Sequence, residues 1–92
     1  MAGSIEWDED KNRRNRRDHG IDLSAAERFE WDTATMRVDD REDYGELREI
    51  AKGFIGDVLH VLVYTRRDDI IRAISLRKST KKERKQYVEE TR

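Results

Sequence analysis

The run VLHVLVYT (residues 58–65) is the most apolar of the chain, and RRDD (66–69) joins it to a second run, IIRAISLR (70–77). Apolar runs of this length, rich in β-branched residues and bounded by turns, are typical of strands. The connection is too short for a crossover, so the two strands are predicted to pair antiparallel. The first run is predicted to be the central strand of the sheet.

Two further strands are predicted before this pair. Residues 34–41 and 46–54 follow one another across the turn EDYG (42–45), and a turn at residues 56–57 leads into the apolar run. Glycine and aspartate are the residues that such turns favour. The four predicted strands are therefore expected to form an antiparallel meander.

Helices are predicted before and after the meander. Asp8 is a predicted N-cap and Gly20 a predicted stop for a first helix that carries no apolar side chain. The capping-box sequence SAAE (24–27) predicts a short second helix, and TKKE (80–83) predicts a C-terminal helix that ends near Glu90. A helix that is polar all round faces solvent or has a functional role.

The length of 92 residues allows one domain. Residues 1–92 are therefore expected to form a single small α+β domain, an antiparallel β-meander with two N-terminal helices and a C-terminal helix. The helices are expected to cover one face of the sheet.

The composition excludes several classes of protein. The chain has no cysteine and two histidines, which excludes a disulfide framework and a zinc-built fold. No apolar run approaches a membrane span, and the N-terminal residues lack the basic and apolar segments of a secretory signal, so a cytoplasmic protein is expected. Phosphate-loop, dinucleotide-binding and zinc-protease motifs are also missing.

The charges are segregated along the chain, although the net charge is −1. Residues 11–17 hold five bases and no acid, and residues 66–92 hold ten bases against five acids. Two basic blocks that are separate in sequence can meet in space and form a patch for phosphate groups. The alternative is that each block is an ordinary solvated face.

Three polar residues of the first predicted helix, Lys11, Asn15 and His19, are spaced four apart and share one face. Histidine can accept or donate a proton near neutral pH. The alternative is that His19 only stabilises the C-terminal end of the helix.

Two pairs of polar residues share parity on predicted strands, Glu46 with Arg48 and Ser75 with Arg77, the latter followed by Lys78. Residues of equal parity point to one face of a sheet and can bracket one ligand group. For Glu46 and Arg48, the residues alone favour exposed ion pairs. The acidic cluster DDRED (39–43) lacks the spacing of a calcium loop and is expected to be a solvated hairpin. His60 is expected to serve the sheet, and the core is expected to include Trp7, Phe29, Trp31 and Phe54.

One set of residues carries a resemblance to a known family: EWD (6–8), Lys11, Asn15, HG (19–20), GELR (45–48), AKG (51–53), VYT (63–65), IRAISLRK (71–78), ER (83–84) and Tyr87. In their order and spacing they resemble the BrnT toxins of type II toxin–antitoxin systems over nearly the whole chain. Two positions depart from the family pattern. Asp18 stands where a basic residue usually precedes His-Gly and weakens the local positive field, and Leu76 replaces a small residue.

The resemblance implies a RelE-like fold and a metal-independent endoribonuclease that needs no cofactor. In such an enzyme the 2′-OH of RNA attacks the phosphorus, and His19 or Glu46 would take its proton. Arg48 and Arg77 would stabilise the charge that builds on the phosphate oxygens. RNA would be bound by Lys11, Asn15, Arg72, Ser75 and Lys78.

The resemblance also implies a protein partner, a BrnA-like antitoxin with a ribbon-helix-helix part, in a hetero-oligomer that meets DNA only through the antitoxin. The antitoxin is expected to cover the RNA-binding surface. An alternative function is a non-catalytic nucleic-acid-binding or regulatory partner subunit that uses the same basic blocks. Such a module would bind nucleic acid in a salt-sensitive way without cleaving it.

Overall fold

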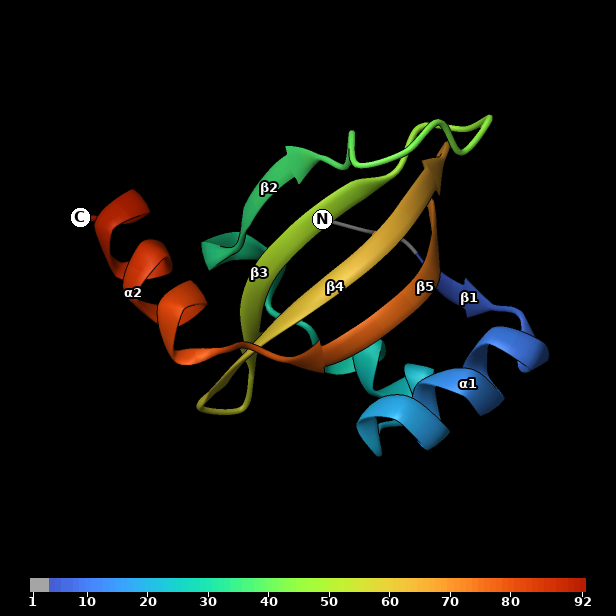
Figure 1. Ribbon diagram of the computed structural model, residues 1–92, viewed down its shortest axis with the longest axis horizontal. Coiled ribbons are helices and arrows are strands. Elements are labelled where there is room, and N and C mark those ends of the chain that lie inside the picture. Colours follow the sequence, from blue (N-terminus) through green and yellow to red (C-terminus); the bar gives the residue numbers. More distant parts are fainter. Residues whose placement is uncertain (1–3) are drawn as a thin grey trace.

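A computed structural model describes residues 4–92 and contains one five-stranded sheet with the strand order β1-β5-β4-β3-β2 (Figure 1). The strands are β1 (Ser4–Trp7), β2 (Thr35–Val38), β3 (Glu49–Ile55), β4 (Val58–Arg67) and β5 (Ile70–Lys78). Strands β2 to β5 pair antiparallel in chain order, so the predicted meander is confirmed, with β4 at its centre. The predicted domain includes residues 1–3, and the expectation that a secretory signal is lacking also involves them. These three residues lie outside the described residues.

The sheet differs from the prediction at its edge. Strand β1 was not predicted, and it pairs parallel with β5, Ile5 opposite Ile71 and Trp7 opposite Ala73. The sheet is therefore mixed rather than purely antiparallel. A four-residue strand has too few residues for its alternation to stand out in the sequence.

The helix α1 (Glu9–His19) follows the sequence prediction closely. Asp8 accepts a hydrogen bond from the backbone N–H of Asp10, and Gly20 ends the helix in the left-handed conformation at φ 70°. The C-terminal helix α2 (Lys81–Glu90) begins with the predicted capping box between Thr80 and Glu83.

The predicted second helix is wrong in type and in its cap. The segment forms two 3₁₀ turns, η1 (Leu23–Arg28) and η2 (Trp31–Thr33). Its N-cap is Asp22, which accepts from the backbone N–H of Ser24. The carboxylate of Asp22 therefore caps the segment two residues before the position that the SAAE sequence suggested.

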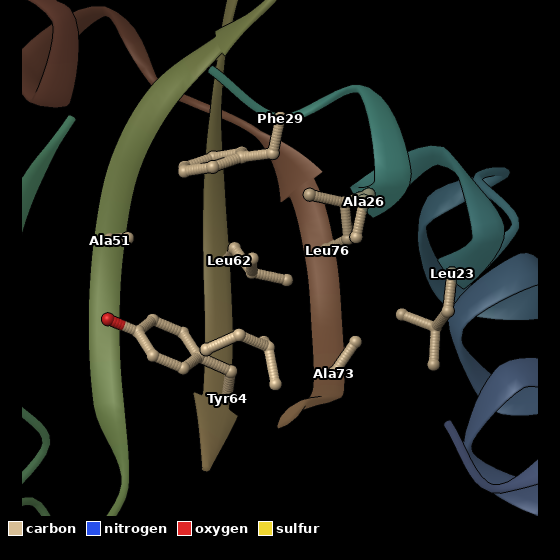
Figure 2. Packing of buried hydrophobic residues seen from close by; sticks show 9 residues of the cluster. Leu23, Ala26, Phe29, Ala51, Leu62, Tyr64, Ala73 and Leu76 are labelled. Atoms are coloured by element: carbon tan, nitrogen blue, oxygen red, sulfur yellow. The ribbon is translucent and has the colours of Figure 1, made fainter. Parts of the chain in front are cut away.

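The main core lies between η1 and one face of the sheet. Phe29, which follows η1, and the completely buried Leu62 and Tyr64 of β4 are among its largest members (Figure 2). Gly53 of β3 allows this close packing, because a Cβ atom there would lie 2.5 Å from the Phe29 ring. The whole cluster consists of Leu23, Ala26, Phe29, Ala51, Leu62, Tyr64, Ile71, Ala73 and Leu76.

Helix α2 lies on the other face, so the expectation that all helices cover one face is wrong. The Tyr87 ring of α2 packs edge-on against Phe54, centroid to centroid 5.5 Å, and Lys52 pairs with Glu90 at 3.1 Å. Phe54 and Lys52 alternate along β3 with Gly53, which faces the core. Figure 1 shows α1 and α2 at opposite ends of the molecule. We call the sheet face that lies opposite the main core and carries Ile50, Val61 and Val63 the open face.

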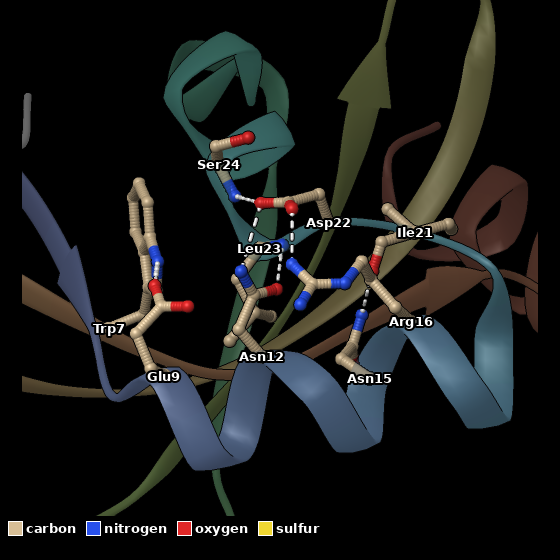
Figure 3. A network of polar contacts seen from close by, with 9 residues as sticks. All are labelled: Trp7, Glu9, Asn12, Asn15, Arg16, Ile21, Asp22, Leu23 and Ser24. Atoms are coloured by element: carbon tan, nitrogen blue, oxygen red, sulfur yellow. Dashed lines mark hydrogen bonds and ion pairs between the residues drawn. The ribbon is translucent and has the colours of Figure 1, made fainter.

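Buried asparagines, rather than apolar side chains, dock α1 on the sheet. Asn12 is 2% exposed, and its side chain bonds the N–H of Leu23 and the carboxylate of Asp22 (Figure 3). Asn15 is 3% exposed and bonds both the N–H and the C=O of Leu76, at 2.9 Å each, and the C=O of Ile21. The amide of Asn15 thereby pairs with the edge of β5 beyond the last residue of β1, as a neighbouring strand would.

Within residues 4–92, no helix has both the length and the apolar character that crossing a membrane requires.

Candidate functional site

A basic pocket of about 280 Å³ lies between α1 and the open face of the sheet. It brings together five of the residues that the sequence predicts for a site: Lys11, Asn15, His19, Arg48 and Ser75. The remaining lining residues are Arg14, Asp18 and Ile74. Side chains from residue 11 to residue 75 of the chain therefore converge on one place, which we call the α1 pocket.

The cations of α1 fall into two groups. Arg13, Arg16 and Arg17 each pair with a carboxylate, that of Asp10, Asp22 and Asp18 respectively. Lys11 and Arg14, the two that line the α1 pocket, have no ion pair within residues 4–92. The two of these five cations that have no carboxylate partner within residues 4–92 are thus the ones that face the pocket.

Sequence reasoning missed Arg14. It stands three residues after Lys11 in the helix, so the two side chains share a face. Arg14 does not belong to the spacing of four that joins Lys11, Asn15 and His19, although a spacing of three places it beside Lys11. Asp18 also faces the pocket, where the nearby Arg17 side chain lowers its pKa and keeps it ionised.

A bulge in β5 aims two residues at the pocket. Val63 pairs with Ser75 and Tyr64 pairs with Ala73, which leaves Ile74 without a cross-strand partner. A residue inserted in this way turns the local strand and redirects side chains, as bulges beside functional sites commonly do. Ile74 packs against the small apolar cluster of the open face while lining the pocket beside Ser75.

Arg48 enters the pocket from the loop before β3, not from a strand as predicted. Its guanidinium lies 4.0 Å from the centre of the Tyr44 ring, and its Nη2 atom is 3.8 Å from a carboxylate oxygen of Glu46. The Nε atom is buried and has no hydrogen-bond partner within residues 4–92. Glu46 and Arg48 therefore do approach one another, but they lie on a loop and not on the strand that was predicted to hold both.

Residues 46–48 are not part of β3, because residues 39–48 fold into a loop around a buried carboxylate. Asp39 is 3% exposed and accepts two hydrogen bonds from the Arg41 guanidinium, at 2.7 Å each. The prediction of a solvated hairpin is therefore wrong for Asp39. The N–H of Asp39 donates to the C=O of Arg48 at 2.8 Å, which closes the loop.

Acidification is expected to weaken the folded state through Asp39 and Glu83. Hydrogen bonds from Arg41 and from Arg77 hold the pKa of Asp39 and of Glu83, respectively, at about 2. Because both values lie below those of an unfolded chain, the stabilisation is complete at neutral pH and is lost as the pH falls from about 5 towards 2.

Urea unfolding at a series of pH values checks this expectation. Asp39→Asn should lower the free energy of unfolding at neutral pH and flatten its decline in acid, whereas the exposed Asp40→Asn should follow the wild type. An Asp39→Asn protein with the wild-type pH profile would contradict the assignment.

The other predicted site residues lie outside the α1 pocket. Arg77 shares the open face with Ser75, but its guanidinium makes two hydrogen bonds of 2.8 Å to Glu83 of α2, which raise its pKa. Arg72 lies further along β5 and pairs with Glu6 at 3.3 Å. Lys78 alternates with Arg77 and points to the opposite face.

The pocket contains one imidazole and three cationic side chains. Within residues 4–92, no three histidine, aspartate or glutamate side chains are placed to hold a metal ion together. The imidazole of His19 beside three cations, Lys11, Arg14 and Arg48, is suited to binding an anionic ester and moving a proton on it.

Comparisons with known proteins match the chain to a family model and to a solved structure. Residues 7–83 match a family model described as the ribonuclease toxin BrnT of type II toxin–antitoxin systems. The crystal structure of the Brucella abortus ribonuclease toxin BrnT is similar in fold, with a TM-score of 0.63 and 24% sequence identity. The match covers 85% of this chain and 97% of that one. A search of curated proteins finds no match.

Proposed function

Starting from the finding that the chain belongs to the BrnT family of ribonuclease toxins of type II toxin–antitoxin systems, we propose that it cleaves RNA in the α1 pocket, without a metal ion. The observation that carries the proposal is that His19 and Arg48, far apart in the sequence, line one pocket with two cations of α1, Lys11 and Arg14. Its small, RelE-like domain would act in the cytoplasm.

RNA supplies its own nucleophile, so the protein needs to position the chain, move a proton and neutralise charge. In the proposed reaction the 2′-oxygen attacks the adjacent phosphorus while His19 takes the 2′-OH proton. The bond from phosphorus to the 5′-oxygen breaks, and the leaving oxygen takes a proton from water. The products are a 2′,3′-cyclic phosphate end and a 5′-OH end.

His19 is favoured over Glu46 as the base. Among the two, only His19 lines the α1 pocket. The Glu46 carboxylate lies on the loop at 3.8 Å from Arg48 and is half-exposed. Glu46 is therefore proposed to orient Arg48 rather than to take the proton.

Arg48 is proposed to bind the oxygens of the phosphate that reacts. Its side chain is 20% exposed, so its charge is partly removed from water and acts more strongly on a bound anion. Ser75 can donate a hydrogen bond to the same group, and Lys11 and Arg14 can hold the neighbouring phosphates.

The remaining predicted residues are less suited to binding RNA in the α1 pocket. The charge of Arg77 is already compensated by Glu83, and that of Arg72 by Glu6, so each is proposed to contact RNA outside the pocket. Lys78 faces away, and the buried amide of Asn15 is fully used by the backbone. Asn15 is accordingly proposed to hold α1 in place instead of binding RNA.

Replacement of Arg48 by alanine is expected to reduce RNA cleavage by roughly 10²- to 10³-fold, the effect of removing one fixed donor to developing charge. The measurement is the rate of RNA cleavage by the purified chain. Arg28→Ala is the matched control, because Arg28 is an exposed arginine on η1, at the core face of the sheet. Equal rates for Arg48→Ala and Arg28→Ala would refute the role of Arg48.

A toxin of a type II system has a protein antitoxin, and we propose a BrnA-like ribbon-helix-helix antitoxin that covers the α1 pocket in a hetero-oligomer. Contact with DNA would then be made by the antitoxin alone. The expected result is that RNA and antitoxin compete, so that a labelled RNA is released as antitoxin is added. A stable ternary complex would show that the two surfaces are separate.

A further inference from the structure

We infer that Tyr44 is a positioning residue of the α1 pocket, whose ring holds the Arg48 guanidinium in the orientation that binds a phosphate group. The inference rests on the proposed function and names a residue that neither the sequence analysis nor the family match assigns.

The contact between the two side chains is close and direct. The Cζ atom of Arg48 lies 4.0 Å from the centre of the Tyr44 ring, well within the range in which a guanidinium is attracted to an aromatic face. The Glu46 carboxylate approaches the same guanidinium at 3.8 Å. Arg48 is thus contacted by an aromatic ring and by an anion, both from residues that precede it in one loop.

The loop itself is anchored at its base, which makes the contact a fixed one. The backbone of Asp39 is bonded to that of Arg48, and the Asp39 side chain is buried against Arg41. The Tyr44 side chain also lies close enough to Asp39 to contribute to its lowered pKa. Tyr44 therefore has one neighbour at the base of the loop and another, Arg48, in the pocket.

The turn after Tyr44 depends on a glycine. Gly45 has a φ of 71°, a conformation that other residues rarely adopt, and its N–H donates to the Asp43 carboxylate. This turn allows the side chains on either side of Gly45, those of Tyr44 and Glu46, to reach Arg48 together.

The Tyr44 ring matters to Arg48 because hydrogen bonds from the Nε atom of Arg48 do not fix its side chain. Its Nε atom is buried without a hydrogen-bond partner within residues 4–92. An arginine side chain has many rotamers, and fixing one of them before RNA binds removes an entropic cost from binding. A ring against one face of the guanidinium restricts it without occupying its N–H groups, which stay available for phosphate oxygens.

The test uses the full chain and a mixed-sequence RNA with 2′-O-methyl riboses, which lacks the nucleophile and so reports binding alone. Tyr44→Leu should weaken binding roughly 3- to 30-fold, the range of a cation–π contact between exposure and burial. Tyr44→Phe keeps the ring and should retain most of the affinity. Leu47→Ala, at a position of the same loop that is 66% exposed, is the matched control.

A double-mutant cycle separates positioning from a general effect on folding. In an Arg48→Ala background, Tyr44→Leu should have no further effect on RNA binding. The inference is overturned if Tyr44→Leu binds as the wild type does, if its effect persists without Arg48, or if Tyr44→Phe is as weak as Tyr44→Leu. If Arg48→Ala alone leaves both binding and cleavage unchanged, the failure lies in the proposed function instead.

Discussion

A His19→Ala variant is expected to cleave RNA roughly 10²- to 10⁴-fold more slowly than the wild type, the range that a general base contributes. His19 is the only imidazole that lines the α1 pocket. The second histidine, His60, is 7% exposed and pairs across the sheet with Gly53, at the core face. Asp18, the carboxylate of the pocket, is a poorer base, because the hydrogen bond from Arg17 lowers its pKa.

The loss of activity must be separated from any effect on the structure, because His19 is the last residue of α1. His19→Gln keeps a polar side chain at this position but provides no base, so it should be as inactive as His19→Ala. Circular dichroism should show an intact fold in both variants, since Gly20 still ends the helix. If His19→Gln cleaves RNA at the wild-type rate, the imidazole has no role in proton transfer.

An Asn15→Ala variant is expected to lose a large part of its free energy of unfolding. The change leaves the N–H and C=O of Leu76 and the C=O of Ile21 without the partner that Asn15 provides. A buried polar group left unpaired costs about 1–3 kcal/mol. A domain of this size is stabilised by only about 5–14 kcal/mol in total, at roughly 0.05–0.15 kcal/mol per residue.

Urea or thermal unfolding followed by circular dichroism measures this loss. Arg13→Ala is the matched control on α1, because Arg13 is exposed and its replacement should change the free energy of unfolding by at most about 0.5 kcal/mol. The result also decides between two roles for Asn15. An Asn15→Ala protein that folds like the wild type but binds RNA poorly would support RNA binding, as the sequence suggested.

The parts of the fold that depend on local signals could be predicted from the sequence. The Asp8 cap, the Gly20 stop and the capping box at Thr80 define helix ends through contacts within a few residues. The apolar run around β4 and the short connections determine the meander. Strand β1 was missed because its pairing with β5 joins residues more than sixty positions apart.

Two polar features could not be predicted because they depend on tertiary burial. Asn12 and Asn15 are polar in sequence, yet they dock α1 by completing the hydrogen bonds of backbone groups far away. Asp39 lies in an acidic run that resembles a solvated turn, but Arg41 neutralises it in the interior. In both cases the pattern of apolar residues contains no information about which polar side chain is buried.

The candidate site was foreseen in part, for a related reason. The helical spacing of Lys11 and His19 and the parity of Ser75 placed these residues on the correct faces. Arg77 has the same parity as Ser75, but its pairing with Glu83 depends on where α2 lies. The contact of Tyr44 with Arg48 depends on how the loop before β3 folds, which the sequence pattern does not indicate.

RNA cleavage by the purified chain in the presence of EDTA, with the product ends identified, tests the α1 pocket most directly. We expect RNA to be cut to fragments that end in a 2′,3′-cyclic phosphate, with no cleavage of an RNA whose riboses lack the 2′-OH. His19→Ala and Arg48→Ala should both lose this activity while still folded. Cleavage that continues unchanged in these two variants, or a wild type that binds RNA and leaves it intact, would contradict the proposed site.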